Sequence, residues 1–251
     1  MAQLQLIEPD WPAPAVVRAV ATTRLGGSSP APYDSLNLGS HVDDEPDRVV
    51  ANRAALRAAA RLPEEPCWLA QVHGTQIVSV GAFSRPPVAD GVTADQPGLV
   101  CAVLTADCLP VLLCDRAGTR VAAIHAGWRG LAQGIIEAAV ADFGRAGIPG
   151  VELLAWLGPA IGPAAYEVGP EVRAAFQAPG DATGFAANAA GRWQCDLPGL
   201  ARGRLRAAGL GLIYGGEHCT HSDARRFFSY RRDGRCGRQA SLIWLEHAAK
   251  R

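Results

Sequence analysis

Cys108 and His125 stand where apolar runs give way to polar or glycine-rich residues. Cys108 follows the apolar run over residues 99–104, and His125 ends another over residues 121–124. His73 lies upstream, in a third stretch that resembles a strand. In α/β proteins the ends of strands are where binding and catalytic residues gather. These three residues are therefore the first candidates for chemistry in this chain.

An imidazole, a thiolate and a second imidazole together suit zinc. Zinc binds His nitrogen and Cys sulfur, and a catalytic zinc keeps three protein ligands with a fourth position open. The spacing alone does not establish a site, because the three residues are spread over separate segments. Two other interpretations stay open: core histidines beside a buried thiol, or a cysteine hydrolase with Cys108 as nucleophile and His125 or His73 as base.

The hydrophobic pattern predicts short strands and a few helices, which must position these side chains. We expect strands at residues 3–7, 16–22, 99–104, 121–124, 152–157, 212–215 and 240–245, one ending at Cys114 and one containing His73 within residues 66–80. We expect helices at residues 44–62, 131–143, 171–176 and 197–209, and a loop at 81–93. No repeat or linker stands out, so we predict a single mixed α/β domain over residues 1–251: a layered sandwich of mixed sheets with helices outside.

Several blocks of the chain resemble the laccase-domain family. QVHG, TADCLPVLL and AAIHAGWRG look like its three signature segments. The likeness continues in TTRLGGSS and SLNLGSHVDD before them and in LGPAIGPAAYEVG after them. Family members were once called multicopper polyphenol oxidoreductases and are now described as purine nucleoside phosphorylases. The resemblance implies that His73, Cys108 and His125 bind a metal, with zinc expected and copper as a substitute.

The resemblance also implies an activity: phosphorolysis of inosine or adenosine to a free base and ribose 1-phosphate. Adenosine deaminase and methylthioadenosine phosphorylase side activities, and editing of peptidoglycan precursors, are alternatives linked to the family. A copper oxidase is disfavoured, because the chain has six histidines and no His-x-His pair. The signature of zinc nucleobase deaminases is absent, so any deamination would use the family's own zinc site.

Substrate-binding residues are expected among the arginines of the family-like blocks. Phosphorolysis needs an anion beside a sugar carbon that becomes cationic, and one guanidinium can bind two phosphate oxygens. Arg24 is the first candidate, because the glycine-rich segment at residues 26–28 can add backbone amides. Arg53, Arg129 and Asn37 complete the predicted nucleoside and phosphate site. Cys108 is predicted to be catalytic as well as a ligand.

Three further features have two interpretations each. Asp107 is predicted to be catalytic, by orienting a ligand histidine or by transferring a proton; alternatively it bonds its own backbone at a strand end. The segment at residues 218–221 contains two histidines and a cysteine, but it lacks a matching pair elsewhere and is not favoured as a metal site. Arg231 and Arg232 either recognise phosphate or form a solvated charge pair.

Composition narrows the class of partner. The formal charges balance at net zero, so no nucleic-acid or anionic-membrane surface is indicated. Seven cysteines, an odd number, without an export signal argue against a disulfide framework and predict a cytoplasmic protein with reduced thiols. No apolar stretch reaches the length of a membrane span. The sequence does not determine the oligomeric state.

Overall fold

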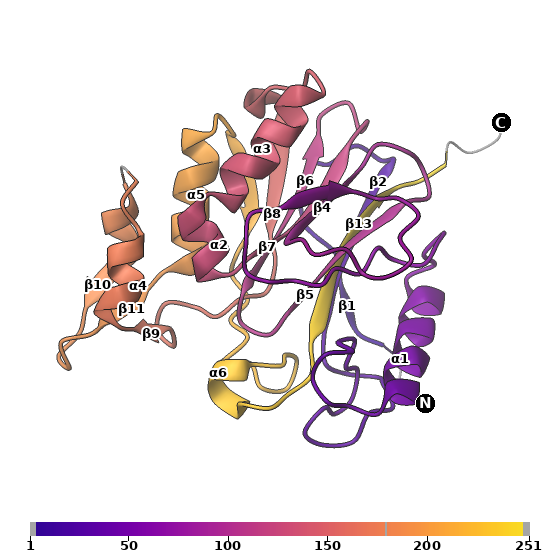
Figure 1. Cartoon of the computed structure of the whole chain (residues 1–251), viewed down its shortest axis with the longest axis horizontal. Helices are drawn as coiled ribbons and strands as arrows, with labels where there is room; N and C mark the ends of the chain where they lie inside the picture. Colours follow the sequence, from indigo (N-terminus) through magenta and orange to yellow (C-terminus); the bar gives the residue numbers. More distant parts are fainter. Residues whose placement is uncertain (1–3, 179, 248–251) are drawn as a thin grey trace.

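Two packed β-sheets form the centre of the structure, a computed structural model that describes residues 4–178 and 180–247 (Figure 1). The four-stranded sheet is antiparallel, in the order β1 (Leu6–Ile7), β2 (Val17–Thr22), β13 (Gln239–Leu245) and β5 (Val100–Thr105). The six-stranded sheet is mixed, in the order β12 (Leu212–Gly215), β8 (Leu153–Leu157), β6 (Leu109–Asp115), β7 (Val121–Ala126), β4 (Gly91–Ala94) and β3 (Ile77–Ser79). The predicted mixed α/β fold is confirmed.

Strand β5 shows how the two sheets share a core. Its side chains alternate between two faces, as the pleat of a strand requires. Cys101 and Val103 pack between the sheets, whereas Ala102 and Leu104 pack with Leu56 of the first helix. Both faces are buried, which explains why the run reads as continuously apolar instead of alternating.

Helices cover the outer faces of the two central sheets or stand beside the sheets (Figure 1). They are α1 (Pro46–Ala59), α2 (Trp128–Gln133), α3 (Ile135–Arg145), α4 (Pro170–Ala175), α5 (Leu197–Ala207) and α6 (Tyr230–Asp233). In α3 the buried residues Ile135, Ala139 and Phe143 recur at helical spacing and pack on the six-stranded sheet. A small third sheet, β10 (Phe185–Ala187), β11 (Trp193–Cys195) and β9 (Glu167–Val168), stands beside α4 (Figure 1).

Three sequence predictions about this fold are wrong. The helix expected at residues 131–143 is two helices, because Gly134 adopts a left-handed φ of 98° between them. The loop expected at residues 81–93 contains the start of β4. His73 is not in a strand: β3 begins four residues later, and His73 itself has a φ of 61°.

The other predicted elements are present with shifted ends. The helix expected at residues 44–62 is shorter at both ends, and the strand expected at 121–124 extends through His125. The strand expected at 3–7 is observed at Leu6–Ile7, while Gln3 lies outside the described residues. Within the described part of the chain, no helix combines the length and hydrophobicity needed to cross a membrane.

Candidate metal centre

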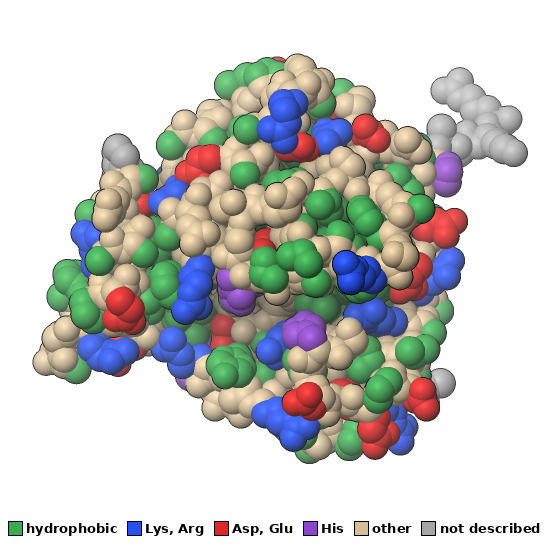
Figure 2. All heavy atoms as spheres, in the orientation of Figure 1, with side chains coloured by type: hydrophobic (Ala, Val, Ile, Leu, Met, Phe, Trp, Pro, Cys, Tyr) green, Lys and Arg blue, Asp and Glu red, His purple; other side chains and the backbone are tan. Residues whose placement is uncertain are grey.

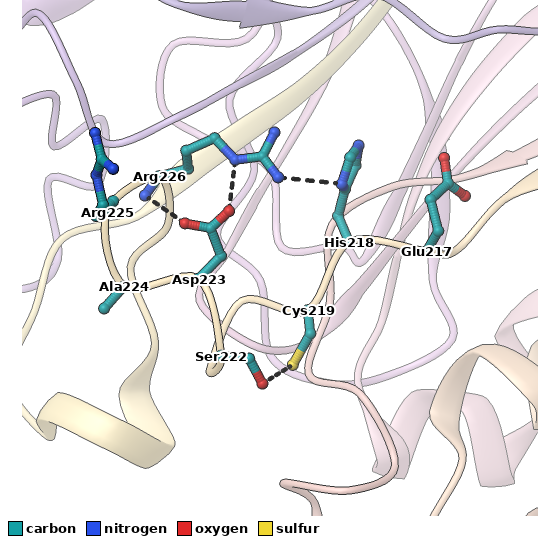
Figure 3. A pocket seen from close by; sticks show the side chains of 8 residues that line it. All are labelled: Glu217, His218, Cys219, Ser222, Asp223, Ala224, Arg225 and Arg226. Atoms are coloured by element: carbon teal, nitrogen blue, oxygen red, sulfur yellow. Dashed lines mark hydrogen bonds and ion pairs between the residues drawn. The ribbon is translucent and has the colours of Figure 1, made fainter.

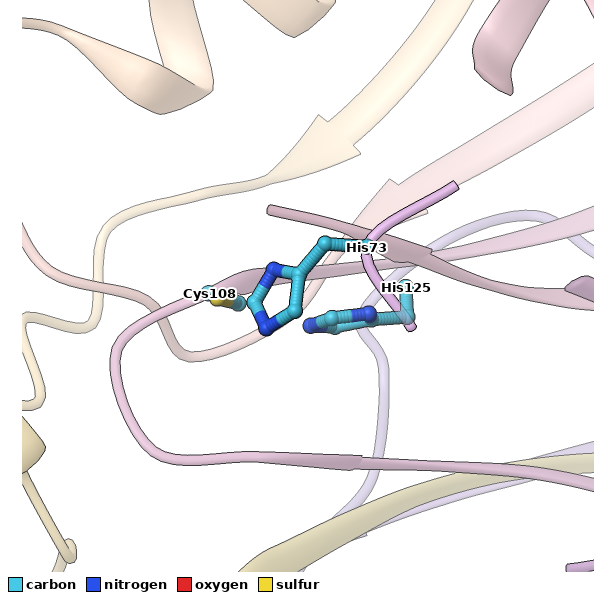
Figure 4. Close-up of side chains that lie close together, drawn as sticks. All are labelled: His73, Cys108 and His125. Atoms are coloured by element: carbon cyan, nitrogen blue, oxygen red, sulfur yellow. The ribbon is translucent and has the colours of Figure 1, made fainter. Parts of the chain in front are cut away.

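Three separate segments meet at the candidate metal centre. His73 lies in the loop before β3, Cys108 in the turn between β5 and β6, and His125 near the end of β7. Their potential ligand atoms all lie within 4.8 Å of one another. Figure 4 shows how closely the three side chains lie together. The structure therefore brings the three predicted ligands to one point.

The charges in this cluster favour a thiolate beside an imidazolium. Burial raises the pKa of the Cys108 thiol, but the imidazoles of His125 and His73 outweigh it and lower that pKa to about 6. Burial lowers the pKa of His125, but the Cys108 thiolate and the Asp90 carboxylate outweigh it and raise that pKa to about 9. A thiolate is the form of cysteine that binds metals and attacks electrophiles.

Asp90, immediately before β4, hydrogen-bonds to His125 and to the loop that contains His73. It was not predicted from the sequence as a site residue. Its buried carboxylate accepts hydrogen bonds from the backbone amides of Val72, His73 and Gly74, at 3.2, 2.9 and 2.7 Å. Its Oδ1 also lies 2.8 Å from Nδ1 of His125. This contact leaves Nε2 of His125 as the nitrogen available to a metal, an arrangement that is general for histidine ligands.

Gly127 makes room for the two ligands that face it. A Cβ atom at this position would lie 2.6 Å from Nδ1 of His73 and 3.1 Å from Sγ of Cys108. Gly127 has an ordinary extended backbone with φ −65° and ψ 158°, so the close approach, and not the backbone conformation, requires glycine. The glycine of the HAGWRG block thus shapes the centre directly.

The donor atoms fit a soft metal ion. Nδ1 of His73 is buried and has no hydrogen-bond partner among the described residues. An unpartnered buried nitrogen is costly unless something else binds it. Two imidazoles and a thiolate are the ligand types that zinc and copper accept. The three residues therefore form a possible metal site.

Both carboxylate oxygens of Asp107 accept hydrogen bonds from the protein. Its Oδ1 accepts a hydrogen bond from the Thr220 hydroxyl at 2.6 Å, and its Oδ2 accepts one from the backbone amide of Arg231 at 2.7 Å. The contact with a ligand histidine comes from Asp90, not from Asp107. Asp107 has a φ of 94°, and such strain is often found at functional sites. Proton transfer by Asp107 stays a prediction.

The predicted substrate residues Arg24 and Asn37 hold the amino-terminal loops together. Nε of Arg24 donates to the carbonyl of Asp34 at 2.7 Å, and its Nη2 pairs with the Asp34 carboxylate at 3.1 Å. The buried Asn37 side chain donates to Asp44 at 2.8 Å and accepts from the backbone amide of Arg238 at 2.9 Å. Direct contact of either residue with substrate stays a prediction.

Arg53 and Arg129 differ in how freely they can reach a ligand. Arg53 donates twice to the carbonyl of Leu38, at 3.0 and 2.8 Å, and stacks 4.1 Å from the ring centroid of Trp68. Arg129 is exposed near the start of α2, and its guanidinium lies 4.4 Å from the centroid of Trp128. Figure 2 shows arginine and histidine side chains next to one another on the face between α2 and α6.

The loop that Asn37 and Arg53 brace carries a further histidine, His41, which the sequence analysis did not single out. The pKa of His41 is lowered by desolvation first, and then by the positive charges of Arg238, Arg53 and His125. No feature of the sequence distinguishes His41 from the other histidines, because its position depends on how the loop folds.

The segment at residues 218–221 does not form a second metal site. His218 and Cys219 line a surface pocket (Figure 3), in which Nδ1 of His218 lies 3.5 Å from Nη2 of Arg226. Sγ of Cys219 accepts hydrogen bonds from the Gly162 amide at 3.2 Å and the Ser222 hydroxyl at 3.3 Å. Among the described residues, only the cluster of His73, Cys108 and His125 brings enough ligand atoms together.

Known proteins are similar to this chain over almost its full length. A Pseudomonas aeruginosa protein named purine nucleoside phosphorylase is 56% identical over 243 residues, covering 96% of this chain and 98% of that protein. An Escherichia coli protein named purine nucleoside phosphorylase YfiH is 52% identical over 244 residues, covering 96% and 99%. The crystal structure of a Neisseria meningitidis protein superposes with a TM-score of 0.92 at 48% identity, covering 96% and 99%.

A family match agrees with these similarities. Residues 18–246 match the family described as multi-copper polyphenol oxidoreductase laccase. The matched region includes all three candidate ligands and nearly every strand of the two central sheets. The chain therefore belongs to the multi-copper polyphenol oxidoreductase laccase family.

Proposed function

We propose that this chain is a zinc-dependent purine nucleoside phosphorylase, which converts inosine or adenosine and phosphate to a free base and ribose 1-phosphate. The observation that carries the proposal is the convergence of His73, Cys108 and His125 within 4.8 Å, in a chain whose relatives are named purine nucleoside phosphorylases. The expected partners are a purine nucleoside and phosphate, and the proposed location is the cytoplasm.

Residues of this chain supply three ligands for the metal and the hydrogen bonds that support them. Cys108 provides the thiolate, His125 provides Nε2, and His73 provides its unpartnered Nδ1. Asp90 fixes the orientation of His125 and, through three backbone amides, the position of His73. When bound, zinc would supply a Lewis acid for a substrate or phosphate oxygen. Copper is accepted by the same donor types.

The protein around the metal centre orients the nucleoside and phosphate. Arg129 is exposed on α2, which starts directly after the His125 strand, so we propose that it contacts substrate. Arg24, Asn37 and Arg53 are proposed to shape the neighbouring loop and to contact substrate from it. Asp107 is proposed to transfer a proton. Holding phosphate next to the sugar carbon supplies much of the catalysis in such a reaction.

A cysteine hydrolase is the second candidate. The pKa of Cys108 near 6 and that of His125 near 9 describe a thiolate and imidazolium pair, which is also how cysteine nucleophiles are activated. In that case phosphate would not be a substrate. Adenosine deamination, methylthioadenosine phosphorolysis and peptidoglycan-precursor editing are further activities that the same experiment must separate.

Elemental analysis of the purified protein and a nucleoside assay together test the proposal. We expect about one zinc per chain, and release of hypoxanthine from inosine only when phosphate is present. Adenosine should give adenine by phosphorolysis, or inosine if the protein also deaminates. Cleavage of inosine at the same rate without phosphate would refute the phosphorylase assignment and favour a hydrolase.

A further inference from the structure

The arginines near the metal centre differ in whether a carboxylate already neutralises them. Arg24 pairs with Asp34 at 3.1 Å, and Arg232 pairs with Asp233 at 2.7 Å. Arg231 forms no ion pair with a carboxylate in the described part of the chain. Its Nη1 donates instead to the main-chain carbonyl of Glu167 at 2.6 Å. The guanidinium of Arg231 therefore keeps its full positive charge for a ligand.

The Glu167 carboxylate does not compensate that charge. It pairs with Nε of Arg192 at 2.8 Å and accepts a hydrogen bond from the Asn188 amide at 2.8 Å. Arg231 contacts only the backbone of this residue. An uncompensated arginine that is held in place is a strong site for an oxyanion, because the guanidinium presents several donors in one plane.

Arg231 is tied to the segment that carries the metal ligand Cys108. Its backbone amide donates to Oδ2 of Asp107 at 2.7 Å, and Asp107 directly precedes Cys108. The helix α6 that contains Arg231 is fixed at its start, where the Ser229 hydroxyl accepts from the Arg232 amide at 3.3 Å. The position of Arg231 relative to the centre is thus set by the main chain and not by its own side chain.

The side chain of Arg231 is held in one orientation by an aromatic ring. Its Cζ lies 5.1 Å from the centroid of Tyr166, which is only 9% exposed. Burial is the main cause that raises the pKa of Tyr166, so its ring stays neutral beside the guanidinium. With Nη1 bound and one face stacked, Nε and Nη2 are the donors left to meet a ligand.

We propose that Arg231 binds the phosphate substrate beside the candidate metal centre, with Tyr166 and the Glu167 carbonyl holding its guanidinium in position. The inference rests on the proposed function and deepens it by identifying where the phosphate lies. Arg231 forms no covalent bond in the reaction, and its role is to hold the dianion by charge-assisted hydrogen bonds.

Kinetics of Arg231→Gln and Arg231→Lys test this role, with Arg206→Gln as the control. Arg206 is exposed on α5, so its replacement removes one charge from the surface. In Arg231→Gln the KM for phosphate should rise about tenfold to a hundredfold, the usual effect of losing charge-assisted hydrogen bonds. Lysine should restore part of it. The KM for inosine and the zinc content should change less than about twofold, and Arg206→Gln should match the wild type.

A second measurement separates this inference from the proposed function. Isothermal titration of the zinc-loaded protein with inorganic phosphate measures anion binding without any turnover. Binding by the wild type that is weakened at least tenfold in Arg231→Gln supports the site, even if inosine cleavage proves independent of phosphate. Equal binding by both proteins, no binding by the wild type, or equal changes in both KM values would overturn the role of Arg231.

Discussion

Two regions of this molecule contain both cysteine and histidine, yet in the described part of the chain only one brings its ligand atoms together as a possible metal site. The segment at residues 218–221 places three such side chains within four consecutive residues, but His218 contacts Arg226 and Cys219 contacts Gly162. His73, Cys108 and His125 are far apart in sequence, and their ligand atoms lie within 4.8 Å of one another.

The difference shows what makes a site in this fold. Neighbouring residues in an irregular segment project in different directions, so local density of ligands does not make them converge. Convergence comes from the central sheets, in which β6 and β7 are paired and the turn before β6 lies beside the end of β7. Asp90 then brings the His73 loop to the same point.

The largest expected contrast is between the two cysteines at these regions. Cys108→Ala should lose bound zinc and phosphorolysis together, because two imidazoles bind zinc more weakly than two imidazoles and a thiolate do. Cys219→Ala should keep both, since Sγ of Cys219 only accepts hydrogen bonds from Gly162 and Ser222. Metal content per chain measures the difference. Zinc retained in Cys108→Ala and lost in Cys219→Ala would reverse our assignment of the two regions.

Gly127→Ala should also remove the metal, although it changes no ligand. The added methyl group would lie 2.6 Å from Nδ1 of His73 and 3.1 Å from Sγ of Cys108, so both side chains would have to move. Gly144→Ala, in α3, is the matched control, because nothing lies within 4 Å of its added Cβ. Alanine there should raise stability by about 0.5–1 kcal/mol, as expected within a helix. Normal zinc content in Gly127→Ala would show that the close approach of His73 and Cys108 does not require glycine at this position.

Asp107→Asn should reduce turnover by about a hundredfold or more if Asp107 transfers a proton. The variant is informative because the amide can keep both contacts: its oxygen can accept from the Arg231 amide and its nitrogen can donate to the Thr220 hydroxyl. Zinc content and melting temperature should therefore stay close to the wild type. Turnover within about threefold of the wild type would leave Asp107 with a structural role alone.

A smaller effect is expected for Asp90→Asn, measured as zinc affinity by competition with a chelator. An asparagine amide cannot accept all the hydrogen bonds from Val72, His73, Gly74 and His125, so the ligands should lose their fixed geometry. Loss of such a supporting partner typically weakens metal binding about tenfold to a hundredfold. Asp223→Asn, at the other region, should leave zinc affinity unchanged. Equal affinities for both variants would argue against the role of Asp90.

The apolar runs were enough to predict the strand before Cys108 and the strand that ends near His125. The set of three ligands was implied by the family resemblance, because the residues alone left other interpretations open. The supporting features could not be predicted, because each depends on contacts between distant segments. Asp90 was expected only as part of a loop. Its supporting role could not be predicted, because its four hydrogen-bond partners are 16 or more residues away in the sequence. The start of β4 was also missed, because it is a glycine, Gly91, which is uncommon inside strands. Tertiary packing requires it: a Cβ there would lie 2.2 Å from Cδ1 of Ile77 and 2.9 Å from Cδ1 of Ile124.

Which arginines pair with a carboxylate also depends on contacts between distant segments. The sequence favoured Arg24, because glycine and serine follow it, and it left Arg231 and Arg232 undecided between phosphate binding and a solvated pair. The two neighbours turn out to differ: Arg232 pairs with Asp233 and donates to the carbonyls of Thr220 and Phe227, whereas Arg231 meets no carboxylate in the described residues. Which arginine keeps a free charge depends on partners that the local sequence does not reveal.

The smallest expected effect is the pH dependence of Cys108 alkylation in metal-free protein. The pKa of this thiol is lowered to about 6 and that of His125 is raised to about 9, so between these values the pair is a thiolate and an imidazolium. The alkylation rate should rise with pH through about 6 and then level off, whereas an ordinary thiol would keep gaining reactivity up to about pH 9. At pH 7 the gain over an ordinary thiol should be only a few-fold, because a thiolate of lower pKa is also a weaker nucleophile. Iodoacetamide labelling read by mass spectrometry assigns the rate to each cysteine, with Cys108→Ala as the blank. A midpoint near 9 for Cys108 would mean that His125 and His73 do not stabilise its thiolate, and the two regions would then differ in geometry alone.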